Sequence, residues 1–196
     1  MVAVAKVGHR LERLKIFGID PGSQVTGFCC LHDAYSLSLH PTVADAGVIR
    51  PTKTLSHSDR LGQIHDSIFA IIDSHSPDFA VIEKGFTGIN QNSALRLGET
   101  RGAIIAAIRR NGCEVIEMAP NEVKKLVTGN GHAKKEDVSL SVELLLKFRR
   151  GKLPYDVTDA VAIAYAYSLK HKSSYSISKN DLNPNSKNLN RSKELS

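Results

Sequence analysis

The sequence has no long hydrophobic run, few cysteines and no histidine cluster of the kind that holds zinc. Its longest uncharged apolar stretch, Ala160 to Tyr167, is far shorter than the roughly 20 residues that cross a bilayer. Residues Met1 to Arg13 carry three basic side chains and no apolar core, so we expect no secretory signal. The three cysteines, Cys29, Cys30 and Cys113, lack metal-type spacing and fit reduced thiols. We therefore expect a soluble, cytoplasmic protein.

The length and composition indicate a single globular domain. Of the 196 residues, 41% are hydrophobic and 23% charged, which excludes a wholly disordered or fibrous chain. With roughly 150 residues per domain as a guide, we expect one domain over residues 15–171. An extension at 1–14 precedes it. A basic tail at 172–196, rich in Ser, Asn and Lys, is expected to be disordered.

The net charge of +6 is unevenly distributed along the chain. Both ends are basic, with four basic and one acidic residue in 1–15 and five basic and two acidic in 172–196. Residues 16–95 hold four basic and eight acidic groups, whereas 96–152 hold twelve basic and seven acidic. This pattern fits a protein that grips a polyanion around an acidic pocket, and it fits a set of solvated faces equally well.

Hydrophobic periodicity predicts alternating strands and helices. The expected strands are Lys15–Asp20, Val25–Leu31, Val43–Ile49, Phe79–Glu83 and Glu114–Met118. The expected helices are 57–74, Asn92–Arg110, a short helix from Pro120 to Gly129, Lys135–Arg149 and Asp156–Leu169. This order predicts an α/β fold in which a mixed five-stranded sheet is flanked by helices on both faces.

Four acidic residues stand where packing alone does not explain them. Asp20 ends the first strand before a Pro-Gly turn, and Glu83 ends the apolar strand that starts at Phe79. Asp156 and Asp159, three apart, project from one face of the last helix. Sites in open α/β folds form at the rim where strands end, so we expect these acids to share a site.

Each acid also has a structural interpretation. Asp20 could cap its turn, Glu83 could pair with Lys84, and Asp156 could cap its helix. Asp159 is harder to explain in this way, because the helix that carries it is apolar and must pack inward. Converging carboxylates repel one another, and Mg²⁺ prefers such oxygen ligands. Two ions about 4 Å apart can activate a water and stabilise the leaving oxygen of a phosphodiester.

Six sequence blocks, in order over about residues 15–171, resemble the RuvC family of Holliday junction resolvases within the RNase H-like superfamily. They are Phe17-Gly18-Ile19-Asp20-Pro21-Gly22-Ser23 with Val25-Thr26-Gly27; Ile82-Glu83 with Phe86; Asn92 to Gly98 through Arg101-Gly102; Val123-Lys124 through Gly129-Asn130-Gly131; Ala133-Lys134-Lys135; and Asp156-Val157-Thr158-Asp159-Ala160.

The resemblance assigns roles to these residues. It makes Asp20, Glu83, Asp156 and Asp159 the catalytic acids that bind metal, with two Mg²⁺ ions per subunit and Mn²⁺ as an expected substitute. It places Lys124 and Lys135 near phosphates, where simple solvation is the alternative, and it makes Phe86 an aromatic that stacks on a base of the opened junction, where a core position is the alternative. Arg96, Arg101 and Lys134 are expected DNA contacts on charge and position.

The resemblance further implies a homodimer, since two symmetric nicks resolve a four-way junction, and cooperation with the RuvA and RuvB branch-migration proteins. It implies preference for certain T-rich sites. Three alternatives stay open at this point: an RNase H-like nuclease with another branched or RNA substrate, an actin-like ATPase that uses the loop from Asp20 to Ser23 for phosphate, and a DNA-binding module that has lost catalysis.

Overall fold

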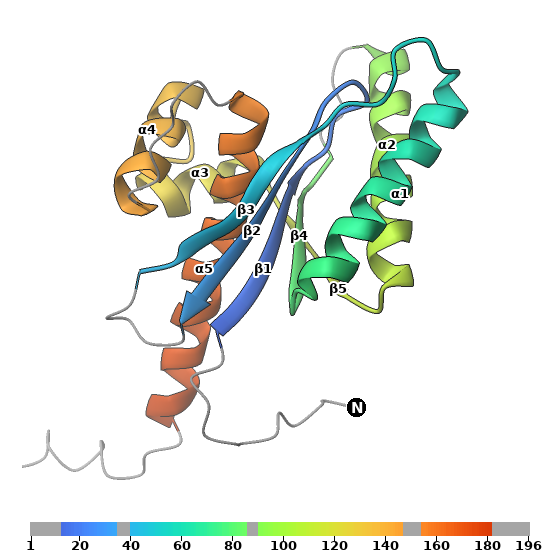
Figure 1. Ribbon diagram of the computed structural model, residues 1–196. Coiled ribbons are helices and arrows are strands. Elements are labelled where there is room, and N and C mark those ends of the chain that lie inside the picture. The colour runs from blue at the N-terminus through green and yellow to red at the C-terminus, as the bar shows by residue number, and fades with distance from the viewer. Residues whose placement is uncertain (1–12, 35–39, 86–89, 147–153, 182–196) are drawn as a thin grey trace, which may run out of the picture.

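The computed structural model describes residues 13–34, 40–85, 90–146 and 154–181, with side chains as far as 174. The described residues form one mixed sheet with helices on both of its faces (Figure 1). This is the architecture expected from the order of elements. In the described part of the chain, no helix is long and apolar enough to span a bilayer.

The sheet has five strands in the order β3-β2-β1-β4-β5. Their bounds are β1 Arg13–Asp20, β2 Thr26–Ala34, β3 Thr42–Ile49, β4 Phe79–Glu83 and β5 Glu114–Met118. The first three strands form an antiparallel meander, whereas β4 and β5 run parallel to β1. The carboxyl ends of β1, β4 and β5 therefore lie at one rim of the sheet, which is where Asp20 and Glu83 end their strands.

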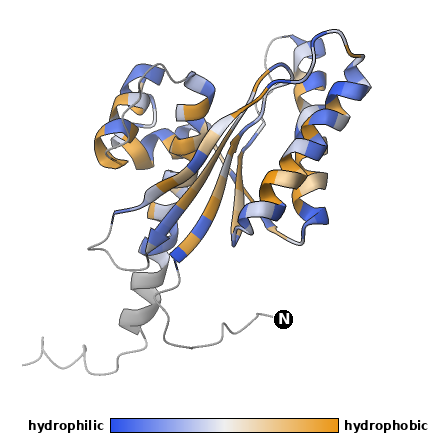
Figure 2. Cartoon of the chain, in the orientation of Figure 1, coloured by the Kyte–Doolittle hydropathy of each residue, from blue (hydrophilic) through white to orange (hydrophobic). Residues whose placement is uncertain are grey.

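The helices divide between the two faces. They are α1 His57–His75, α2 Gln91–Arg110, α3 Pro120–Thr128, α4 Lys135–Leu146 and α5 Tyr155–Asp181. The pair α1 and α2 covers one face, and α5, flanked by α3 and α4, covers the other (Figure 1). Figure 2 shows hydrophobic residues concentrated on the strands and on the helix sides turned toward them.

The two-residue period of the strands determines which face each side chain occupies. On β1, Leu14 and Ile16 join the core beneath α5, whereas Phe17 and Ile19 join the core beneath α1 and α2. Asp20 shares the parity of Leu14 and Ile16, so it belongs to the α5 face. The same count places Glu83 there, because Val81 on β4 packs in the α5 core.

Two glycines allow α5 to approach the sheet closely. A Cβ on Gly18 of β1 would lie 2.8 Å from the Cβ of Ala164, and a Cβ on Gly27 of β2 would lie 1.9 Å from the carbonyl oxygen of Asp156. Neither position has room for a side chain. Since Gly27 pairs with Asp20 in the β1–β2 register, this contact brings the start of α5 beside Asp20.

The last helix is longer than the sequence predicts. We expected it to end near Leu169 with a disordered tail from Lys172, but α5 continues to Asp181. Lys172 is held by an ion pair of 2.7 Å with Asp33, whose side chain is fully buried on β2. The sequence pattern missed this pair because both residues look solvent-exposed when read alone. Residues 182–196 and 1–12 lie outside the described residues.

Candidate active site

The four predicted acids come from three elements and meet at the rim of the sheet on the α5 face. Asp20 and Glu83 end β1 and β4, which are adjacent parallel strands with Ile19 paired to Ile82. Asp156 and Asp159 lie in the first turns of α5, whose start rests on Gly27. All four side chains are partly buried.

Asp20 has the most perturbed titration of the four acids. Its pKa is raised to about 7, above all because burial disfavours the charged form. The negative charges of Asp159, Glu83 and Asp156 raise this pKa as well, while Lys135 lowers it. Carboxylates act on one another in this way when they lie within a few ångströms, so these interactions put the other three acids near Asp20.

The pKa values of the Glu83 and Asp159 carboxyl groups are raised as well. Burial is the main cause for both, and a neighbouring carboxylate adds to it: Asp159 acts on Glu83, and Asp156 acts on Asp159. Lys124 and Lys135 lower the pKa of both acids. The two predicted lysines therefore lie at this site.

Lys135 makes the most direct contact with an acid. Its Nζ lies 2.5 Å from Oδ2 of Asp159 and 5.3 Å from the centre of the Tyr155 ring. Burial alone would lower the pKa of this ammonium group, but the hydrogen bond to Asp159 and the charges of Asp20 and Asp156 raise it. Lys135 is thus a fixed positive charge at the acidic site.

The donor set suits a hard divalent cation. Within the described residues, no three His, Cys, Asp or Glu side chains are already arranged as a complete ligand cage. Yet the negative charges of Asp159, Glu83 and Asp156 all act on Asp20, and their repulsion raises its pKa beyond the effect of burial alone. A divalent cation bound there would relieve that repulsion, and Mg²⁺ prefers such ligands.

Two small cavities meet at Glu83. The first, of about 150 Å³, lies between Glu83, Lys124, Lys135 and Asp159 and has an apolar floor that includes Val138. The second, of about 160 Å³, lies on the other side of Glu83, and Arg101 forms part of its wall. The carboxylate of Glu83 is therefore accessible from a concave surface.

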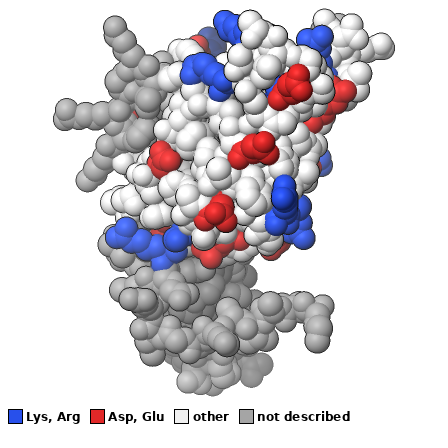
Figure 3. All heavy atoms as spheres, turned by 45° about the vertical axis from the view of Figure 1, so that its right-hand side comes forward, with Lys and Arg blue, Asp and Glu red and all other residues white. Residues whose placement is uncertain are grey.

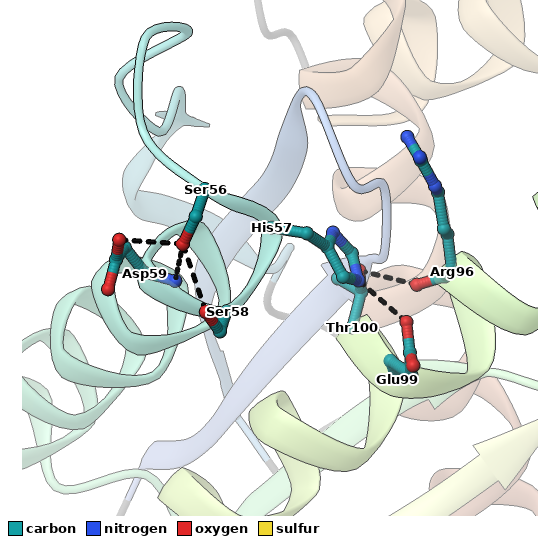
Figure 4. Close-up of polar contacts among 7 residues, drawn as sticks. All are labelled: Ser56, His57, Ser58, Asp59, Arg96, Glu99 and Thr100. Atoms are coloured by element: carbon teal, nitrogen blue, oxygen red, sulfur yellow. Dashed lines mark hydrogen bonds and ion pairs between the residues drawn. The ribbon is translucent and has the colours of Figure 1, made fainter.

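The other predicted DNA contacts differ in whether their side chains are exposed or held by protein groups. Arg96 on α2 and Lys134 just before α4 are exposed, and Figure 4 shows the Arg96 side chain extending away from the neighbouring His57–Glu99 ion pair of 2.6 Å. The guanidinium of Arg101 is instead engaged by protein groups. Phe86 lies outside the described residues.

The surface on the side of α1 and α2, away from the acids, carries charges of both signs. Figure 3, in which the side covered by α1 and α2 comes forward, shows acidic and basic side chains interspersed among uncharged surface. Across the described residues of that view, neither sign forms a continuous field. The basic side chains beside the acids are those of Lys124 on α3 and Lys135 on α4.

Three residues of the site were given no role at the sequence level. Gly18 and Gly27 set the distance between sheet and α5, and Tyr155 places its ring beside Lys135. The glycines could have been found, because a glycine inside an otherwise apolar strand marks a close approach. An exposed tyrosine at the start of a helix gives no such signal.

Comparison with known proteins agrees with this geometry. A family model described as "Crossover junction endodeoxyribonuclease RuvC" matches residues 16–167. A protein of that name from Pelodictyon phaeoclathratiforme is 40% identical over 149 residues, covering 76% of each chain. Another, from Chlorobaculum parvum, is 38% identical over 150 residues, covering 76% of this chain and 79% of the relative.

Solved structures give the same result. Thermus thermophilus RuvC in complex with its Holliday junction substrate superposes with a TM-score of 0.76 at 26% identity, covering 82% of this chain and 96% of that one. A yeast mitochondrial Holliday junction resolvase, 15% identical with a TM-score of 0.57, shares the fold over 85% and 86% of the two chains. On sequence, architecture and match length together, this chain belongs to the RuvC family.

Proposed function

We propose that this chain is a crossover junction endodeoxyribonuclease that resolves Holliday junctions in DNA recombination and repair by hydrolysing phosphodiesters symmetrically. The observation that supports this most strongly is the convergence of Asp20, Glu83 and Asp159 with Lys135 at one rim of the sheet, in a chain of the RuvC family. An actin-like ATPase is not supported, because the family model and the similar relatives are RuvC endodeoxyribonucleases.

We propose Mg²⁺ as the metal, with Asp20, Glu83, Asp156 and Asp159 as its ligands. When bound, two such ions would supply an activated water and stabilise the leaving oxygen. The chain's own contribution is to hold four carboxylates at a partly buried rim, where burial strengthens their electrostatic interactions. The Gly27 contact fixes the backbone of Asp156 against the strand that pairs with Asp20.

The basic residues are proposed to hold the DNA. Lys124 and Lys135 face the acids, so they would contact the phosphates next to the scissile bond, and the charge of Lys135 would oppose the negative charge that develops there. Lys134 and Arg96 are exposed and would contact the backbone further out. Phe86 is proposed to stack on an unpaired base.

A homodimer in the cytoplasm, working with RuvA and RuvB, completes the proposal. A four-way junction offers two equivalent strands of like polarity, and a two-fold dimer places one site on each. Sedimentation of the protein at its working concentration tests this. A dimer is expected, whereas a monomer that cuts both strands fully would contradict it.

The substrate is tested by strand cleavage of a labelled synthetic four-way junction, compared with linear duplex of the same sequence, with and without Mg²⁺. Cleavage should require the junction and the metal, and the nicks should be symmetric. Asp156→Asn protein, purified in parallel, controls for contaminating nuclease. Equal cleavage of linear DNA or of RNA would contradict junction specificity and leave only an RNase H-like nuclease.

A further inference from the structure

Arg101 lies behind the candidate site and is held by two strands. From the middle of α2 its Nη1 donates a hydrogen bond to the backbone carbonyl of Glu83, and its Nη2 lies 2.8 Å from Oε1 of Glu117 on β5. Only 11% of the side chain is exposed. The guanidinium therefore ties the last residue of β4 to its neighbour strand.

The strand parity shows that Arg101 reaches Glu83 from the face opposite the carboxylate. Met118 packs in the core beneath α5, so Glu117, one residue earlier, lies on the face of α2. Glu83 pairs with Met118 in the register of β4 and β5, and its side chain lies on the α5 face with Lys124 and Asp159. Arg101 thus contacts the backbone of Glu83 while the carboxylate points to the site.

The end of β4 is a place where the backbone needs such support. One further hydrogen bond, from the amide of Lys84 to the carbonyl of Met118 at 2.7 Å, continues the pairing past Glu83. At Gly85 the chain runs so close to Arg101 that an added Cβ would lie 3.2 Å from its Nε. The guanidinium is packed between the strand end and the chain that leaves it.

We propose that Arg101 is a positioning residue that holds the backbone of Glu83 so that its carboxylate is presented to the metal site, with Glu117 as its anchor. The inference rests on the proposed role of Glu83 as a metal ligand. Supporting groups of this kind commonly change metal affinity or activity by about 10- to 100-fold when they are removed.

A direct contact with a DNA phosphate, which the charge of Arg101 suggests at first, predicts different behaviour. A phosphate contact contributes to affinity and to its salt dependence, so its loss weakens binding and lowers the salt slope by about one. A positioning residue leaves both unchanged and instead affects the metal requirement and the cleavage rate. The pairing with Glu117 favours the second behaviour, because it already neutralises the guanidinium.

The test compares Arg101→Met with Arg109→Met. Arg109 is a matched control: it lies on the same helix and donates to a backbone carbonyl, that of Cys113 at 3.1 Å, but Cys113 comes just before the start of β5 rather than at its end. Four quantities are measured for each protein: the single-turnover cleavage rate at saturating enzyme, the Mg²⁺ concentration for half the maximal rate, calorimetric Mg²⁺ binding without DNA, and junction affinity against salt without metal.

Arg101→Met should cut about 100-fold more slowly and bind Mg²⁺ about tenfold more weakly, with the junction affinity and salt slope of the wild type. Arg109→Met should match the wild type in all four measurements. Arg101→Lys should fall between, because one ammonium group cannot span both partners. A wild-type rate for Arg101→Met, or a lost salt slope at an unchanged rate, would overturn the inference.

Glu117→Gln provides a second route if Arg101→Met does not fold. Glu117 is 42% exposed, so this variant should keep the fold, and it should shift cleavage and Mg²⁺ binding in the same direction by a smaller factor. Tighter junction binding with a steeper salt slope would instead mean that the freed arginine binds DNA. Wild-type protein that fails to cut junctions would count against the proposed function, whereas the Mg²⁺ binding comparison would still test Arg101.

Discussion

The charged form of Asp20 lowers the stability of the folded protein. This residue ends an otherwise buried strand, and the neighbouring carboxylates act on it together. With a pKa of about 7 against an ordinary value of 3.8, the folded protein retains a proton that the unfolded chain loses. Without metal, stability should therefore fall as the pH rises from about 4 to about 7 and then level off.

Asp20→Asn should remove this cost. At pH 8 without divalent metal, the variant should be more stable than the wild type by up to about 4 kcal/mol, the free energy that a pKa raised from 3.8 to about 7 represents, because the partly buried charge is gone. This corresponds to a melting temperature up to about 12 °C higher. Near pH 4 the two proteins should melt together, and Mg²⁺ should stabilise only the wild type. Thermal unfolding between pH 4 and pH 8 measures the difference, and a difference independent of pH would contradict the interpretation.

The acids and Arg101 show what could be predicted at the scale of single residues. Asp20 and Glu83 were predictable because a charged residue at the end of an apolar strand is unusual and a sheet rim is where sites form. Arg101 was predicted as a DNA contact, but its partners are a backbone carbonyl and Glu117. No sequence pattern shows which carbonyl lies beside a side chain, so this arrangement required the structure.

At the scale of elements, the contact between β2 and α5 places two of the four acids. Gly27→Ala would put a Cβ 1.9 Å from the carbonyl oxygen of Asp156, so α5 would have to move. We expect a loss of about 2 kcal/mol in the free energy of unfolding and a cleavage rate reduced at least about 100-fold.

Gly62→Ala is the control for Gly27→Ala. Gly62 is exposed within α1, and nothing lies within 4 Å of an added Cβ. This variant should gain about 0.5–1 kcal/mol from helix propensity and cut normally. Urea unfolding and junction cleavage measure both proteins, and a Gly27→Ala protein with normal cleavage would show that α5 does not need this approach.

The middle of α5 is held to β2 by a buried ion pair. Asp33 is fully buried, accepts a hydrogen bond from Ser168 and pairs with Lys172, which is 12% exposed. Lys172→Met should lower the free energy of unfolding by about 3 kcal/mol, because it removes an ion-pair partner of a fully buried carboxylate. Urea denaturation measures this.

Lys170→Met is the matched control on the same helix. Lys170 pairs with Glu122 at 2.7 Å, but both side chains are exposed, at 49% and 37%, so its loss should cost less than about 1 kcal/mol. If the two variants were equally stable, the pair of Lys172 and Asp33 would not be what holds α5 to β2.

For the whole molecule, the sequence predicted architecture better than boundaries. The apolar runs of β4 and β5 and the periodic helices α1, α2 and α3 were found to within a few residues, because burial imposes their patterns locally. Strand β2 was expected to stop at Leu31 and continues to Ala34. Its polar end, Asp33, is fully buried, and it contacts Ser168, 135 positions along the chain, and Lys172. Such long-range pairing leaves no local signal.

The claim on which the whole account depends is that the gathered acids carry out the cleavage rather than hold the fold. Asp159→Asn protein measures this most directly, with binding and strand cleavage of one labelled four-way junction followed in the same Mg²⁺ reaction beside the wild type. The account predicts junction binding at wild-type affinity and cleavage reduced by at least about 1,000-fold, since several kcal/mol of transition-state stabilisation are lost. Normal cleavage by Asp159→Asn would contradict the assignment of the site.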